Sequence, residues 1–220
     1  MKKLLLSLLA ACALLPVKAD EGMWLPMLIG KNYEEMKRLG LKLSKDDLYS
    51  INNSSIKDAI IQFGGGCTGE IISPNGLLIT NHHCGYGAIT ALSTVEKNYL
   101  DNGFWAHSYA EELPAKDITA LFLERMEDVT AEVAKAVGKS KGEKFDKKYK
   151  EITEKIKKRA EGKGNYTAEV KSYFDGNQYI LLVYKKYKDI RLVGTPQKSL
   201  GKYGGDTDNW MWPRHTSDFS

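Results

Sequence analysis

Two short cysteine-containing segments with a hairpin signal between them constrain this sequence most. Residues 66–69 (GCTG) lead into one β-prone run, and residues 80–84 (TNHHC) follow the next. Residues 73–76 (SPNG) separate the runs, and Asn-Gly after proline is typical of a tight turn between antiparallel strands. We therefore predict that residues 68–72 and 77–80 pair as a hairpin with one cysteine near each end.

Residues 1–19 have the features of a secretory signal peptide. Two lysines precede an apolar stretch, residues 4–15, that is too short to span a bilayer, and a small-x-small pattern ends at Ala19. We expect cleavage after Ala19 and export to the periplasm, the cell surface or the medium. A lipoprotein anchored at Cys12 is the disfavoured alternative, because apolar sequence continues after that cysteine.

Charge and cysteine content indicate which partners the protein has and whether its cysteines are bonded. The whole chain has 32 Lys and Arg against 28 Asp and Glu, and three of the lysines lie in the signal segment. The exported part, residues 20–220, is thus nearly neutral, which argues against nucleic acid as a partner. It keeps two cysteines, Cys67 and Cys84, and an even pair in an oxidising compartment favours a disulfide over two buried thiols.

The pattern of apolar residues predicts a mainly β fold with helical segments. Helical periodicity is expected over residues 20–53 and 128–161. Strands are expected at residues 60–63, 68–72, 77–80, 118–126, 167–174, 179–187 and 190–193.

The histidine pair is the first candidate for chemistry. His83 is preferred as a catalytic base because it directly precedes Cys84 in an expected loop after a strand, and His82 is interpreted as a neighbour that shapes this loop. Two alternatives remain: a metal site with Cys84, although adjacent residues rarely close one tetrahedral site, and a structural loop pair. His107 has no motif and is interpreted as an ordinary surface residue.

The second candidate is the segment 204–219, which combines glycines with two tryptophans, several aspartates, an asparagine and an arginine. An aromatic wall with a few fixed polar groups is typical of a ligand pocket. The alternative is a loop held in place by its tryptophans.

Three segments resemble a known family. Residues 80–87 (TNHHCGYG), 209–219 (NWMWPRHTSDF) and 20–24 (DEGMW) are similar to the bacterial serine dipeptidyl-peptidases of the dipeptidyl-peptidase 7 and 11 type. The resemblance covers nearly all of the exported chain. It implies a chymotrypsin-like double β-barrel with an inserted helical domain, of which this chain would hold the first barrel plus helices.

The resemblance also implies roles for individual residues. His83 would be the catalytic base and Asp218 the carboxylate that orients it, while Asn209, Trp210 and Arg214 would hold the N-terminus of the substrate. A disulfide between the two cysteines would hold the histidine against the barrel. The resemblance implies no cofactor and no metal.

Local differences bear on these roles. Ser217 stands where the family usually has glycine, and Asp206 and Asp208 are rival carboxylates that only the motif ranks below Asp218. Because arginine cannot bind an ammonium directly, Arg214 is expected to orient its neighbours instead.

The predicted function is that of a serine dipeptidyl-peptidase that releases N-terminal dipeptides from peptides with a free amine. No Gly-x-Ser-Gly segment occurs in the 220 residues, so we expect the nucleophile beyond Ser220, a sequence truncated within the peptidase domain, and no activity from these residues alone. A homodimer of the full-length enzyme is a further expectation. The alternatives are a non-catalytic peptide-binding protein on a protease-like barrel and an exported serine endopeptidase.

Overall fold

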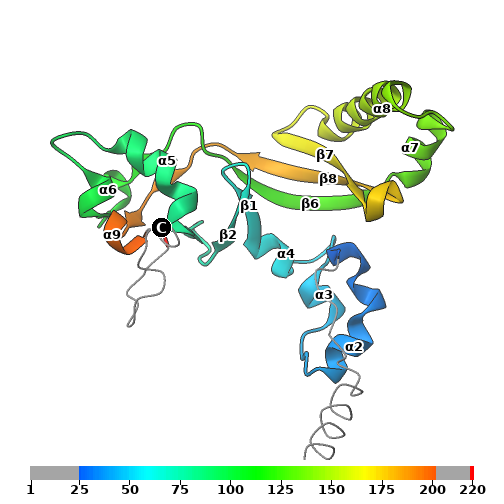
Figure 1. The fold of residues 1–220 in the computed structure, drawn as a ribbon. Helices are drawn as coiled ribbons and strands as arrows, with labels where there is room; N and C mark the ends of the chain where they lie inside the picture. The colour runs from blue at the N-terminus through cyan, green and yellow to red at the C-terminus, as the bar shows by residue number, and fades with distance from the viewer. Residues whose placement is uncertain (1–24, 202–218) are drawn as a thin grey trace, which may run out of the picture.

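The structure is a computed structural model and describes residues 25–201 and 219–220 of the chain. Figure 1 shows a long antiparallel sheet with separate groups of helices at its two ends and the N-terminal helices below it. The helices are η1 (Pro26–Lys31), α2 (Tyr33–Arg38), α3 (Lys45–Leu48), α4 (Ile56–Ala59), α5 (His82–Leu92), α6 (Tyr99–Asn102), η2 (Tyr109–Glu111), α7 (Thr130–Val137), α8 (Glu143–Glu161), η3 (Phe174–Gly176) and α9 (Lys198–Gly201). The strands are β1 (Ile60–Phe63), β2 (Cys67–Ile71), β3 (Leu78–Thr80), β4 (Phe104–Trp105), β5 (Leu113–Pro114), β6 (Ala120–Asp128), β7 (Tyr166–Tyr173), β8 (Gln178–Tyr187), β9 (Arg191–Leu192) and β10 (Gly194–Thr195).

Six strands form one sheet in the order β3-β2-β1-β6-β8-β7, and every neighbouring pair in it is antiparallel. Two short ribbons, β10 with β4 and β5 with β9, are the other β-structure among the described residues. Within the described part of the chain, the six-stranded sheet stays open at β3 and β7. The expected combination of antiparallel strands and helical segments is thus confirmed, but the described residues form a mixed α/β structure and not a mainly β one, and their strands do not close into the expected first barrel.

The predicted hairpin is confirmed as strands β2 and β3, with Gly69 opposite Thr80 and Ile71 opposite Leu78. Its turn includes Gly76 at φ 84°, a left-handed conformation that glycine adopts without strain. The Ser73 hydroxyl accepts a hydrogen bond from the backbone N–H of Leu77 at 2.9 Å, which closes the turn. β1 pairs with the other side of β2 and so makes a three-stranded meander next to the histidines.

The lysine-rich segment forms two helices, α7 and α8, where the sequence pattern suggested one helical stretch. Gly138 and Gly142, at φ 56° and 55°, stand between the helices and interrupt the helical conformation. Val133 of α7 and Ile156 of α8 are fully buried against strands β7 and β8. The expected amphipathic pattern of α8 is therefore confirmed, with its apolar side on the sheet.

The first half of strand β8 is buried on both faces. Leu181 and Val183 point into the core under α7 and α8, whereas Ile180 and Leu182 point into a second core with Met126. The N-terminal segment packs on this second core through Leu25, Met27 and Tyr49, so helices cover the sheet from opposite sides (Figure 1). None of the helices in residues 25–201 combines the length and apolar character that a membrane span requires.

Candidate active site

Residues 82–84 form the first turn of α5 directly after strand β3. Asn81 is extended (φ −75°, ψ 143°), and its carbonyl accepts hydrogen bonds from the N–H groups of Cys84 (2.9 Å) and Gly85 (3.3 Å). The histidines were expected in a loop, so the helix start is a correction. Gly85 and Ile89 are buried on the inner side of the helix, and this packing outweighs the low helix propensity of glycine.

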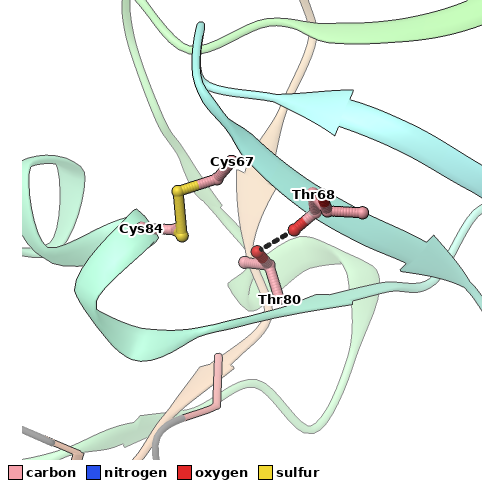
Figure 2. The surroundings of a disulfide bond; sticks show 4 residues. All are labelled: Cys67, Thr68, Thr80 and Cys84. Atoms are coloured by element: carbon pink, nitrogen blue, oxygen red, sulfur yellow. Dashed lines mark hydrogen bonds between the residues drawn. A yellow bond between two sulfur atoms is a disulfide. The ribbon is translucent and has the colours of Figure 1, made fainter. Parts of the chain in front are cut away.

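A disulfide joins this turn to the sheet. Cys67, at the start of β2, is bonded to Cys84, with an S–S distance of 2.04 Å and a Cα–Cα distance of 6.1 Å (Figure 2). Beside it, the Thr80 hydroxyl donates a hydrogen bond to the carbonyl of Thr68 at 2.7 Å (Figure 2). The disulfide predicted from the cysteine pair is confirmed, and it fixes the first turn of α5 to strand β2.

His83 lies on the exposed side of this turn. A nitrogen of its ring lies within 4.8 Å of the sulfur atoms of Cys67 and Cys84. Because both sulfur atoms are in the disulfide, neither is available as a thiolate, and the cluster offers a metal ion only one imidazole. An accessible imidazole on a covalently tethered helix start is suited to general-base chemistry.

His82 lies on the opposite side and is completely buried. Its Nδ1 is 3.0 Å from the hydroxyl of Thr195 in β10 and 3.2 Å from the hydroxyl of Ser220. The ring also packs edge-on against Tyr86, with centroids 6.1 Å apart. Consecutive helical residues project about 100° apart, which explains why one histidine is enclosed while the other, His83, faces outward.

The segment that follows Asp218 is hydrogen bonded to the end of β3. Thr80 and Ser220 exchange two backbone hydrogen bonds, each 2.9 Å long. Phe219 packs near Trp105, with ring centroids 6.1 Å apart. Thr80 lies three residues before His83. Its pairing with Ser220 therefore holds Ser220 beside the β3–α5 junction.

The remaining predicted residues lie outside the described part of the chain. They are the signal segment 1–19 with Cys12, and Asp206, Asp208, Asn209, Trp210, Arg214, Ser217 and Asp218. His107 is exposed, as expected of a surface residue.

Sequence reasoning missed Thr195 and Ser220 as partners of the histidine turn. Thr195 belongs to a strand of two residues, which is too short for any periodic pattern, and its contact to His82 spans 113 residues. No local signal marks either hydroxyl, so only the folded chain identifies them.

The chain is similar to known proteins in both sequence and fold. The family model described as Peptidase S46 matches residues 19–220. The dipeptidyl-peptidase 7 of Capnocytophaga gingivalis is 50% identical over 226 residues, which cover 100% of this chain and 32% of the relative. The Asp/Glu-specific dipeptidyl-peptidase of Porphyromonas gingivalis is 49% identical over 228 residues, with the same coverage of 100% and 32%.

Solved structures give the same result. The crystal structure of Porphyromonas endodontalis DPP11 in complex with substrate matches with a TM-score of 0.79 and 42% identity, covering 91% of this chain and 30% of that one. The chain spans about a third of the length of the curated relatives it matches. A family model that covers nearly the whole sequence, together with these relatives, shows that the chain belongs to the Peptidase S46 family.

Proposed function

We propose that the protein is a serine dipeptidyl-peptidase and that these 220 residues supply two members of its catalytic triad. His83 is the general base, Asp218 is the carboxylate that orients it, and the serine belongs to a part of the protein outside this chain. The relatives named above are dipeptidyl-peptidases, and P. endodontalis DPP11 has been crystallised with the dipeptides Arg-Glu and Arg-Asp.

The observation that best supports the proposal is the structure of the β3–α5 junction. His83 is accessible, a disulfide at the next residue restrains its helix turn, and Ser220, two residues after Asp218, is paired with Thr80 at the start of the same junction. Such restraint matters because a displacement of about 1 Å from the reactive geometry can cost on the order of 100-fold in rate.

In the proposed reaction, His83 takes the proton of the attacking serine hydroxyl and later returns it to the leaving amine. Asp218 keeps the imidazole in the tautomer that this proton transfer needs and stabilises the imidazolium. The oxyanion that forms on the substrate carbonyl would be stabilised by backbone amides beside the serine, outside this chain.

Dipeptide release requires the enzyme to count two residues from a free amine. In the proposal, Asn209, Trp210 and Arg214 contribute to an end-stop for the substrate N-terminus. The asparagine carbonyl would accept a hydrogen bond from the ammonium, and the arginine would orient its neighbours. Preference between acidic and hydrophobic penultimate residues would depend on a pocket outside these residues.

The proposal extends to the architecture and the location of the protein. The β1–β2–β3 meander would belong to the first barrel of a chymotrypsin-like pair, with residues 20–220 as the N-terminal part of the peptidase domain and the full-length enzyme forming a homodimer. Residues 1–19 would direct export. Mass spectrometry of the exported protein should find Asp20 as its first residue, and a lipidated Cys12 would contradict this.

The decisive experiment compares single variants of the full-length protein on a fluorogenic dipeptide substrate with a free amine. We expect His83→Ala to lower kcat by at least about 1,000-fold. The matched control is His107→Ala, which removes another exposed imidazole and should keep wild-type kcat. The unfolding temperature of each variant reports whether the fold is intact.

Three outcomes would contradict the proposal. Activity of His83→Ala near the wild-type level would show that the base is misassigned. Equal cleavage of an N-acetylated substrate by the wild-type protein would identify an endopeptidase, since release of N-terminal dipeptides requires recognition of the free amine. A wild-type protein that binds peptides without cleaving them would identify a non-catalytic binding protein.

A further inference from the structure

We propose that His82, Thr195 and Ser220 are positioning residues that hold the segment following Asp218 against the helix turn that carries His83. The inference rests on the proposed function and deepens it. It assigns a role to a buried polar cluster in which none of the three side chains would touch the substrate.

The cluster joins three parts of the chain that are far apart in sequence. His82 comes from α5, Thr195 from β10 and Ser220 from the segment paired with β3. His82 and Thr195 are fully buried, and the Thr195 and Ser220 hydroxyl oxygens are 3.3 Å apart. The histidine contacts span 113 and 138 residues, so each hydrogen bond closes a long loop of the chain.

The hydrogen-bond geometry favours one assignment of the protons. Each hydroxyl has one proton to donate. The Ser220 hydroxyl lies 2.8 Å from the carbonyl of Phe219, and the Thr195 hydroxyl lies 3.2 Å from the carbonyl of Pro196. If both hydroxyls donate to these carbonyls, Nδ1–H of His82 can donate to both hydroxyl oxygens, and no proton lies between the two hydroxyls. We assign the Nδ1 proton on this basis.

Thr195 is the fixed point of the cluster. Its strand pairs with β4, where Thr195 lies opposite Phe104. The backbone of Gly103 passes so close that a Cβ built there would lie 3.0 Å from the Thr195 carbonyl oxygen. These close contacts restrict the movement of Thr195, so its hydroxyl has a fixed position relative to His82 and Ser220.

The consequence for the site is geometric. Rotation of the first turn of α5 would break the contact from His82 to Thr195, and that turn also sets the direction of His83. Displacement of the segment after Asp218 would break the contacts of Ser220. The Thr195 hydroxyl therefore limits the motion of the α5 turn directly and, through His82, that of the segment that follows Asp218.

The test uses the full-length protein and a threonine series. Thr195→Val replaces the hydroxyl by a methyl group, and Thr195→Ser keeps the hydroxyl. We expect Thr195→Val to lower kcat about 10- to 100-fold with KM changed less than about threefold, and Thr195→Ser to stay within about threefold of wild type. Recovery by serine distinguishes a hydrogen bond from the packing of the side chain.

The matched control is Thr153→Val in α8, at the end of the sheet away from α5 (Figure 1). Thr153 is also a buried threonine, and its hydroxyl donates to the carbonyl of Tyr149 at 2.8 Å. This variant should lose thermal stability to a degree similar to Thr195→Val while keeping wild-type kcat. Equal losses of kcat in both valine variants would overturn the proposal.

A second variant keeps the proposal testable if Thr195→Val does not fold. Ser220 is only partly buried, so Ser220→Ala should fold and should lower kcat at least about fivefold. A kcat within twofold of wild type for Ser220→Ala and for any folded Thr195→Val would overturn the inference. If His83→Ala abolishes turnover in the same assay, the proposed function survives that result; if it does not, the proposed function itself fails.

Discussion

Removal of the disulfide should loosen the histidine turn by a predictable amount. The perturbation is the double substitution Cys67→Ala and Cys84→Ala, which avoids any side effect of a reductant. The cross-link closes a loop with a sequence separation of 17 residues, for which the chain-entropy relation gives about 3 kcal/mol at 25 °C. The loop spans the β2–β3 hairpin and ends in the first turn of α5.

Neighbouring contacts change this estimate of the lost free energy in two opposite directions. The β2–β3 ladder and the Thr80–Thr68 hydrogen bond persist without the disulfide, so the opened loop keeps some order and gains less entropy. Loss of the sulfur atoms from the small core around Phe63 acts in the opposite direction. We therefore expect a decrease of about 2–4 kcal/mol in the free energy of local opening.

Hydrogen exchange measured by mass spectrometry reports this quantity for the segment itself. Because about 1.4 kcal/mol is a factor of ten, a decrease of about 3 kcal/mol should speed exchange of residues 67–92 roughly 100-fold. Residues 143–161 in α8 serve as the internal control and should exchange at an unchanged rate. Exchange of residues 67–92 within about threefold of wild type would refute the loop-entropy argument.

Three other substitutions test separate parts of the structure. Ile156→Ala empties a fully buried site under α8 and should lower the free energy of unfolding by about 2–5 kcal/mol in urea titration; a loss below about 1 kcal/mol would contradict the described core. Hydrogen bonds from the Thr130 side chain, Gln178 and the Thr130 N–H hold the pKa of Asp128 below its ordinary value. The ionised carboxylate therefore stabilises the fold above the unfolded pKa of about 4, and this contribution is lost as pH falls through the lower folded pKa. Because solvent screens this exposed carboxylate, Asp128→Asn should cost no more than about 0.5–1 kcal/mol at neutral pH, and the difference from wild type should shrink in acid. A difference that grows in acid would contradict this reasoning. Gly103→Ala should cost more than about 1 kcal/mol, because φ is 76° and the new Cβ would meet the Thr195 carbonyl, whereas the control Gly87→Ala, in helix α5 with open space around it, should be neutral or stabilising in the same melting experiment.

Much of the fold was predictable because its signals are local. The Asn75-Gly76 turn lies between two β-prone runs, and the 3.6-residue periodicity of α8 needs only the residues of that helix. The cysteine pair was equally readable, since an exported chain with two cysteines has one pairing available.

The parts that sequence reasoning missed depend on distant residues. The position of His83 beside Cys84 was a local signal that ranked the two histidines, but the burial of His82 involves Thr195 and Ser220, which are far away in sequence. The two-residue strands β4 and β10 have no pattern of their own and exist only as partners of each other. The histidines were expected in a loop just after a strand; in the structure they begin α5, because packing under the helix overrides the low helix propensity of its glycines.

The long sequence separations around His82 have a consequence for how the chain folds. The β1–β2–β3 meander joins neighbouring segments, and loops of this size close quickly, whereas the contacts of His82 wait for residues 113 and 138 positions further along the chain. We expect the meander and its disulfide to form early and the histidine turn to reach its final orientation among the last events of folding. The histidine turn can therefore reach its final orientation only once the chain has been synthesised as far as Ser220, well after the hairpin that precedes the turn.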